Sequence, residues 1–203
     1  MSLTSKEFLQ ESQLRRSYRK FLPEPVDMEV IQDCIMTANT APSGANLQPW
    51  HFSIVVSPEI KQKIRTAAEK VEVEFYKDKI SDQWRQDLEF LKVNTEKPFL
   101  TEAPCLIVIF KENYRYLEDG TQAPNYYVTE SACLATGLLI NALRNAGYSS
   151  LTYTPAPMSF LRDILGRGKN ETPVMVLAVG KKDPSYNLPP IERKTFEQIA
   201  DIF

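Results

Sequence analysis

The chain has 203 residues, with 24 Lys and Arg against 26 Asp and Glu, so its formal net charge is −2. This balance argues against a general nucleic-acid binder, because such a protein needs a surplus of positive charge to displace counterions from phosphates. Hydrophobic residues make up 43% of the chain and charged residues 25%, which excludes a disordered polypeptide and predicts one globular domain over residues 1–203.

Helical patterns dominate the first half of the chain. The predicted elements are helices over 4–13 and 28–39, a strand over 51–56, and helices over 59–77 and 81–91. Phe8 and Leu9 stand on the expected inward face of the first helix. Asp27 is suited to cap the second helix, because its carboxylate can accept from the free amides of the first turn.

Strands carry most of the predicted core in the second half. The predicted elements are a strand over 104–110, a loop over 112–125, a helix over 127–145, a strand over 149–152, a helix over 160–165, a strand over 174–179 and a polar tail over 181–203. Residues 104–110 form a continuous apolar run, which is typical of a strand buried on both faces. Few, unevenly spaced strands among helices predict an α+β fold rather than a barrel.

Several common cofactor and metal motifs are absent from the sequence. Gly166 and Gly168 are the one close pair of glycines, and they fit neither a dinucleotide fingerprint nor a P-loop. Three separated cysteines and one histidine do not match the ligand set of a structural zinc site, so no metal is expected. The odd cysteine count, the lack of a signal peptide and the lack of an apolar run of ~18–20 residues predict a cytoplasmic protein without a membrane span.

A cluster of cationic and hydroxyl-bearing residues follows the first predicted helix: Arg15, Arg16, Ser17, Tyr18 and Arg19. Guanidinium groups present a planar fork of donors that matches phosphate, and a serine hydroxyl adds another donor. The same composition also fits a solvated, charged turn, and Arg193 in the tail fits ordinary surface charge.

The turn over residues 42–46 is a second candidate site. Prolines restrict the backbone on both sides of it, and Gly44 permits a positive φ or a close approach. Such a turn can offer amide hydrogens to an anionic or carbonyl oxygen, although it equally fits an ordinary helix-to-strand connection.

Glu72, Tyr76 and Lys97 form a third candidate site. Glu72 and Tyr76 are four residues apart, so they share one face of the predicted helix over 59–77. With Lys97 they could bind the ammonium and the carboxylate of an amino acid, or they could belong to a solvated helix face.

Two segments together resemble the opening of the nitroreductase superfamily of flavin enzymes. They are the arginine-rich residues 15–19 and the run Ala-Pro-Ser-Gly-Ala-Asn-Leu-Gln-Pro-Trp at 41–50. The insert that carries Glu72, Tyr76 and Lys97 is similar to the iodotyrosine deiodinase branch of that superfamily, since ordinary nitroreductases lack it. The resemblance implies a nitroreductase-like mixed β-sheet flanked by helices, in an intertwined homodimer with FMN at the subunit interface. It also implies a helical lid over about 70–100, below called the lid segment, and a tail over about 181–203 that embraces the partner.

The resemblance further implies roles for individual residues. The implied FMN contacts are Arg15, Arg16, Ser17, Tyr18, Arg19, Ser43, Gly44, Thr152, Tyr153, Thr154 and Arg193. Thr154 stands where a hydroxyl faces flavin N5, and Ala45 stands where a backbone amide contacts the substrate phenolate, so both are implied as catalytic. Glu72, Tyr76 and Lys97 stand where the amino-acid end of the substrate is clamped, and Ala45 is the fourth implied substrate contact.

The implied activity is FMN-dependent reductive dehalogenation of halotyrosines, with an electron donor that the sequence leaves unnamed. The expected partners are a second copy of the chain and a halotyrosine or tyrosine ligand, without nucleic acid or membrane. Two other functions stay open: NAD(P)H-dependent reduction of nitro compounds or quinones on the same fold, and non-catalytic binding of flavin or tyrosine.

Overall fold

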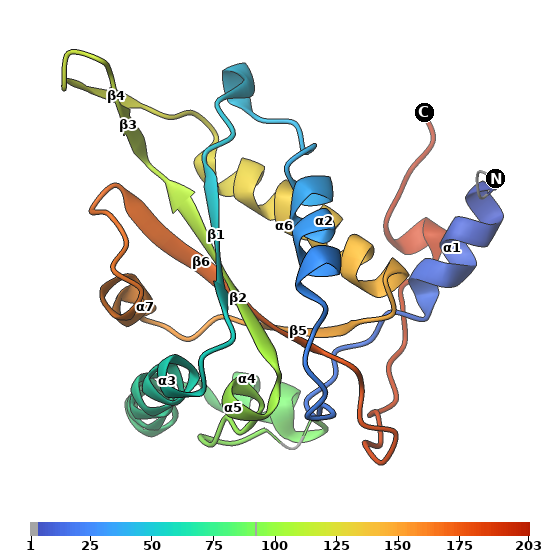
Figure 1. The fold of residues 1–203 in the computed structure, drawn as a ribbon. Coiled ribbons are helices and arrows are strands. Elements are labelled where there is room, and N and C mark those ends of the chain that lie inside the picture. The colour runs from blue at the N-terminus through green and yellow to red at the C-terminus, as the bar shows by residue number, and fades with distance from the viewer. Residues whose placement is uncertain (1–3, 92) are drawn as a thin grey trace.

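A four-stranded sheet in the order β1-β2-β6-β5 runs through the centre of the computed structural model, which describes residues 4–91 and 93–203 (Figure 1). Its strands are β1 (Trp50–Val55), β2 (Cys105–Glu112), β5 (Ser149–Tyr153) and β6 (Glu171–Gly180). The α-helices are α1 (Ser5–Gln13), α2 (Met28–Ala38), α3 (Pro58–Asp78), α4 (Asp82–Glu89), α5 (Phe99–Glu102), α6 (Val128–Asn145) and α7 (Ser159–Ile164). The remaining elements of the described residues are the 3-10 helices η1 (Gly44–Asn46) and η2 (Phe196–Gln198) and the strands β3 (Tyr114–Tyr116) and β4 (Gln122–Pro124). The predicted domain and the lid segment also include residues 1–3 and 92, which lie outside the described residues.

β2 is an inner strand of the sheet and is covered on both faces. It pairs antiparallel with β1 and β6, and β5 pairs antiparallel with β6. Every residue from Cys105 to Phe110 is fully buried, so the strand predicted from the apolar run is confirmed. A mixed sheet contains parallel as well as antiparallel pairs of strands. Within the described residues, the one parallel pairing is the isolated bridge between Ser17 and Ser150 at the edge of β5.

Helices cover the two faces of the sheet with separate cores. The even-numbered residues from Leu106 to Phe110 pack with side chains of α3, α5 and α7. The odd-numbered residues from Cys105 to Ile109 pack with side chains of α2 and α6. Alternation with a period of two directs successive side chains of a strand to opposite faces. The predicted α+β fold with flanking helices is therefore confirmed.

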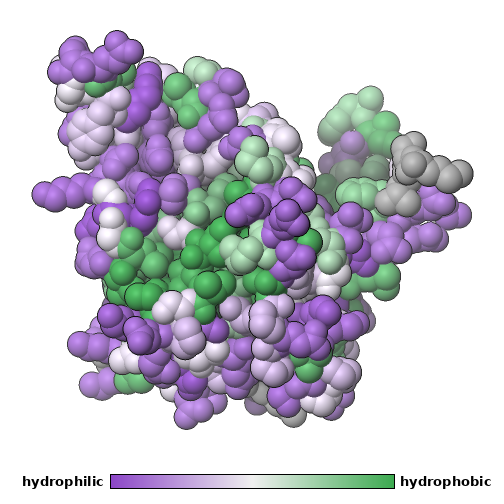
Figure 2. Space-filling model, viewed as in Figure 1, coloured by the Kyte–Doolittle hydropathy of each residue, from purple (hydrophilic) through white to green (hydrophobic). Residues whose placement is uncertain are grey.

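α1 and the C-terminal tail project from the body of the molecule (Figure 1). The prediction that Phe8 and Leu9 face inward is wrong: their exposed fractions are 54% and 56%, because no described residue of the same chain covers this face of α1. The tail likewise exposes Phe196 and Ile199. Hydrophobic side chains also gather in the middle of the face shown in Figure 2. Apolar surface of this kind is typical of an interface with another protein.

The predicted loop over 112–125 contains a hairpin that the sequence pattern did not reveal. Its strands β3 and β4 pair antiparallel over three residues each. Strands this short carry too few residues for a period of two to emerge from the sequence. α5 was not predicted either, because its 4 residues form a single turn and are too few to show the helical period of about 3.6.

Neither a membrane-spanning helix nor a metal cluster occurs in the described part of the chain. Each of its helices is too short or too polar to cross a bilayer. No three side chains of His, Cys, Asp or Glu among the described residues come together as a metal ion requires. Burial lowers the pKa of His51, the one histidine.

A carboxylate at the end of β2 makes stability depend on pH. Burial raises the pKa of Glu112, and the negative charge of Glu171 raises it further. The fold therefore favours the protonated carboxyl, so ionised Glu112 costs stability above its unfolded pKa and the cost vanishes as the pH falls below that value. We expect Glu112→Gln to raise the free energy of unfolding at pH 7 by less than about 1 kcal/mol and to match the wild type below about pH 4. Urea unfolding at both pH values measures this, and a less stable variant at pH 7 would contradict it.

Candidate functional site

Glu72, Tyr76 and Lys97 meet on the inner side of the lid segment. Glu72 Oε2 and Lys97 Nζ form an ion pair at 3.0 Å, and the exposed fractions of these side chains are 12% and 8%. Lys97 Nζ lies 5.6 Å from the centroid of the Tyr76 ring and also donates to the carbonyl of Asn94. The three residues predicted as a clamp for a zwitterion are thus brought together, and two of them neutralise each other.

Tyr153 joins this group from β5. Its hydroxyl donates to Glu72 Oε1 at 2.8 Å, and its ring packs edge-on against Phe99 with centroids 5.3 Å apart. Burial raises the pKa of Tyr153, and the charge of Glu72 raises it further. Burial and Glu72 raise the pKa of Tyr76 as well. Both phenols therefore keep their proton and remain hydrogen-bond donors.

A second carboxylate on α3 holds the backbone of Lys97. Glu69 Oε1 accepts from the amide of Lys97 at 2.8 Å and from Arg65 Nε at 2.8 Å. Arg65 also donates from Nη1 to the hydroxyl of Thr101 at 2.9 Å. Glu69 and Glu72 are three residues apart on one face of α3, so one helix positions both the backbone and the ammonium of Lys97. That spacing was the available sequence signal for Glu69, which was not among the predicted site residues.

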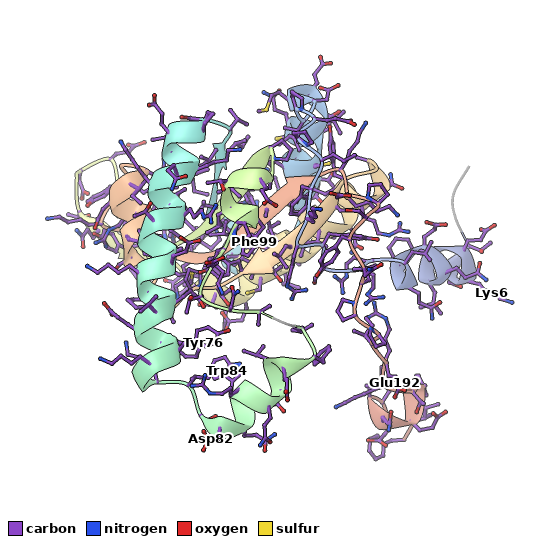
Figure 3. All side chains as sticks on the ribbon, turned by 90° about the horizontal axis from the view of Figure 1, so that it is seen from below. Lys6, Tyr76, Asp82, Trp84, Phe99 and Glu192 are labelled. Carbon is purple, nitrogen blue, oxygen red and sulfur yellow. The ribbon has the colours of Figure 1, made fainter. Side chains whose placement is uncertain are left out.

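A cavity of about 640 Å³ opens beside the clamp. Its walls come from the lid segment, from Thr152 and Tyr153 of β5, from Arg19 and from residues 186–190 of the tail. Figure 3 shows Tyr76 and Trp84 between α3 and α4, with Phe99 lying toward the sheet. Aromatic walls with a few charged groups are typical of a site for a small ligand.

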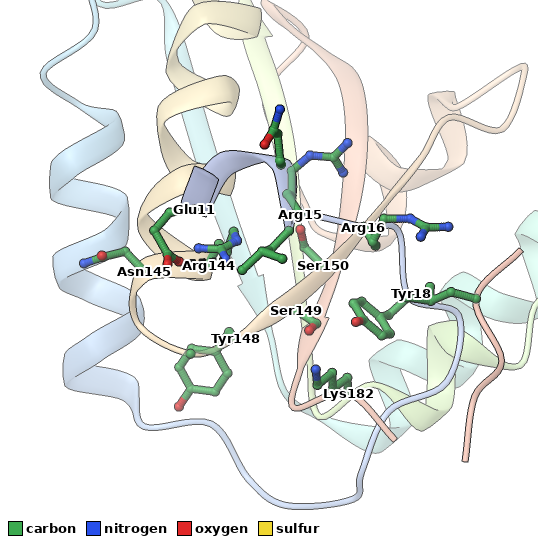
Figure 4. Close-up of a pocket in the computed structure, with 14 residues that line it drawn as sticks. Glu11, Arg15, Arg16, Tyr18, Arg144, Asn145, Tyr148, Ser149, Ser150 and Lys182 are labelled. Carbon is green, nitrogen blue, oxygen red and sulfur yellow. Dashed lines mark hydrogen bonds and ion pairs between the residues drawn. The ribbon is translucent and has the colours of Figure 1, made fainter. Parts of the chain in front are cut away.

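Arg15, Arg16 and Arg193 form a second part of the candidate site, and Arg15 and Arg16 line a cavity of about 610 Å³ (Figure 4). Arg193 donates to the carbonyl of Arg15 at 3.3 Å, and Arg16 donates to the carbonyl of Pro189, so both hydrogen bonds tie the tail to the cluster. Burial lowers the pKa of Arg15, and the positive charges of Arg193 and Arg16 lower it further. Within the described residues, none of the three arginines pairs with a carboxylate. Like charges held together in this way fit an anion such as a phosphate.

The other predicted residues of this segment lie in different surroundings. Ser17 bridges to Ser150 on the edge of β5. Tyr18 lines the cavity beside Arg15 and Arg16, whereas Arg19 lines the cavity beside the clamp. The segment thus contributes side chains to both cavities.

The turn that contains Ser43, Gly44 and Ala45 has an unusual backbone. Ala45 has φ of 51°, and Asn46 and Gln48 also have positive φ, which costs non-glycine residues energy. The hydroxyl of Ser43 accepts from the amide of Gln48 at 3.0 Å. Within the described residues, the hydrogen bonds of the turn leave the amide of Ala45 free. A Cβ on Gly44 would lie 2.8 Å from the ring of Tyr127, so the turn requires glycine there.

The turn is far from the clamp within one chain. η1 precedes β1 and α3 follows it, and Figure 1 shows them at opposite ends of that strand. Six residues of strand span about 20 Å. Thr152 and Thr154 are exposed at the end of β5, while the Tyr153 side chain faces Glu72. The structure therefore brings the arginines, β5 and the clamp to one region and leaves Ser43, Gly44 and Ala45 apart from it.

Sequence comparisons identify relatives over most of the chain. Residues 13–181 match the model of the nitroreductase family. The iodotyrosine deiodinase of Haliscomenobacter hydrossis is 46% identical over 190 residues, which are 94% of this chain and 86% of that protein. The human iodotyrosine deiodinase 1 is 40% identical over 196 residues, which are 96% of this chain and 68% of that protein.

Solved structures of flavoproteins are also similar to this chain over most of its length. An oxidised iodotyrosine deiodinase bound to FMN and 3-iodo-L-tyrosine superposes with a TM-score of 0.78 at 29% identity, and the match covers 93% of this chain and 100% of that one. A BluB-like flavoprotein from Clostridium difficile 630 superposes with a TM-score of 0.74 at 24% identity over 100% of both chains, and it shows likeness of fold.

Proposed function

This chain belongs to the nitroreductase family, and we propose that it removes halide reductively from halotyrosines, as its deiodinase relatives do. It is an FMN-dependent oxidoreductase of this family. The deiodinase relatives and the clamp of Glu72, Tyr76 and Lys97 support a halotyrosine as the substrate.

The observation that carries the proposal is the buried ion pair of Glu72 and Lys97. A zwitterionic amino acid can insert between these groups, so that its ammonium pairs with Glu72 and its carboxylate with Lys97. One ion pair is then exchanged for two, and no buried charge loses its partner, which limits the desolvation cost of binding. A ligand with a single charge would leave one member of the pair alone.

An FMN phosphate fits the cluster of Arg15, Arg16 and Arg193, because these neighbouring cations have no carboxylate partner among the described residues. Ser17 and Arg19 follow on the same segment, and Thr152, Tyr153 and Thr154 would lie along the flavin ring.

When bound and reduced, FMN supplies two electrons, so that the carbon–halogen bond breaks, halide leaves and a proton takes its place on the ring. Thr154 is exposed, so its hydroxyl could donate toward the flavin, and Tyr18 would flank the phosphate end.

The turn at Ser43, Gly44 and Ala45 would come from a second copy of the chain. Since η1 and the lid segment lie at opposite ends of β1, a homodimer in which each copy extends its turn to the other would complete two sites (Figure 1). The free amide of Ala45 could then donate to the phenolate oxygen of the ligand and stabilise its charge. The same dimer would cover the exposed apolar residues of α1 and the tail, which would embrace the partner.

The decisive test is anaerobic incubation of the FMN-loaded protein with dithionite and 3-iodotyrosine. We expect one iodide ion and one tyrosine for each molecule of 3-iodotyrosine consumed. Protein without FMN serves as the control and should release no iodide. Rapid bleaching of the flavin by NAD(P)H with turnover of nitroaromatics and no iodide release would support a nitro or quinone reductase instead. Tight binding without turnover would indicate a binding protein.

A further inference from the structure

Tyr153 connects the clamp to the central sheet. It is the last residue of β5, and its main chain pairs with Val176 of β6. Its ring packs against Phe99, a residue that is 7% exposed. The hydroxyl is thus carried by a paired strand and by a half-buried ring that packs against the core, and it donates to Glu72 at 2.8 Å.

The two oxygens of Glu72 have different partners. Oε1 accepts from Tyr153, and Oε2 pairs with Lys97 at 3.0 Å. When the carboxylate of a ligand takes Lys97, the contact of Oε2 becomes available while Oε1 stays bound to Tyr153. A glutamate fixed through one oxygen loses less side-chain freedom on binding than a free one, which favours affinity.

We propose that Tyr153 is a positioning residue for substrate recognition: it holds the carboxylate of Glu72 in place to receive the ammonium group of an amino acid ligand. This inference rests on the proposed function, since it assumes that Glu72 binds the substrate ammonium. It assigns the side chain of Tyr153 to the amino-acid end of the ligand, while its main chain remains available to the flavin. The high pKa of the phenol supports this role, because the hydroxyl stays protonated and can donate over the whole working range of pH.

The test compares Tyr153→Phe with the wild type on three ligands, by isothermal titration calorimetry of the FMN-loaded protein. The variant keeps the ring against Phe99 and removes only the donor. The ligands are 3-iodotyrosine, 3-iodotyramine, which has the ammonium but no carboxylate, and 3-(4-hydroxy-3-iodophenyl)propanoate, which has the carboxylate but no ammonium. We expect the affinity for the first two to fall about five- to tenfold and that for the third to stay unchanged. In turnover, KM for 3-iodotyrosine should rise by a similar factor with kcat nearly constant.

Tyr116→Phe is the matched control. Tyr116 lies on β3, its exposed fraction is 59%, and it lines neither of the two cavities. We expect it to leave all three affinities unchanged. An equal loss for the three ligands in Tyr153→Phe, or no loss for any, would overturn the positioning role while the proposed function stands. A wild type that fails to bind 3-iodotyrosine would overturn the proposed function, and the positioning role with it.

Discussion

Glu72→Gln should weaken the binding of 3-iodotyrosine about ten- to a hundredfold and leave FMN bound. The amide can still accept the hydrogen bond from Tyr153, but it carries no charge to pair with the ligand ammonium. The substitution also releases Lys97 from its ion pair. An analogue that has a carboxylate but no ammonium should therefore bind the variant at least as tightly as the wild type. Quenching of flavin fluorescence on titration with each ligand measures both effects.

Glu74→Gln is the control for this substitution. Glu74 lies on α3 as Glu72 does, and it is exposed, so the same change of charge is made outside the clamp. We expect its ligand affinities to equal those of the wild type. Equal affinity of Glu72→Gln and wild type for 3-iodotyrosine would show that Glu72 does not receive the ammonium.

The second large effect is expected at the arginine cluster. Arg15→Met should raise the dissociation constant of FMN about ten- to a hundredfold, because a charge-assisted contact with phosphate is lost. Without FMN the same substitution should not lower the stability of the protein, since it removes repulsion between Arg15 and its cationic neighbours Arg16 and Arg193. Thermal unfolding of the FMN-free protein and fluorescence titration with FMN measure the two effects separately.

Lys63→Met serves as the control, because Lys63 is exposed on α3 and its loss changes the net charge equally. Added salt should weaken FMN binding by the wild type more than by Arg15→Met, since fewer charges contribute in the variant. A variant that retains FMN as tightly as the wild type, or one that unfolds at a lower temperature without FMN, would show that Arg15 has a structural role instead.

The main elements of the fold were predictable because their signals are local. The apolar run at 104–110 marks β2, and the carboxylate of Asp27 accepts from the amide of Glu29 at 2.9 Å at the start of α2. The clamp was predictable in part, since Glu72 and Tyr76 share a helix face by spacing alone. The choice of Lys97 as the third residue of the clamp came from the family resemblance, because a contact across the lid segment leaves no periodic pattern.

Other features depend on contacts that no local pattern encodes. The hydrogen bond from Tyr153 to Glu72 joins residues 81 positions apart, and it depends on which strand lies at the edge of the sheet. The exposure of Phe8 and Leu9 could not be deduced from an amphipathic pattern, because such a pattern predicts an apolar face but not which chain covers it. The position of η1 relative to α3 likewise follows from the sheet and not from the turn itself.

The location of η1 across β1 from the lid segment affects how the protein would respond to dilution (Figure 1). In the proposed dimer each flavin site is shared, so cofactor loading and association of the copies are thermodynamically linked, and each strengthens the other by the same factor. Dilution would then release yellow cofactor, and excess FMN would lower the concentration at which the copies separate. An isolated copy would be catalytically silent, which would restrict the reducing power of the flavin to the assembled enzyme.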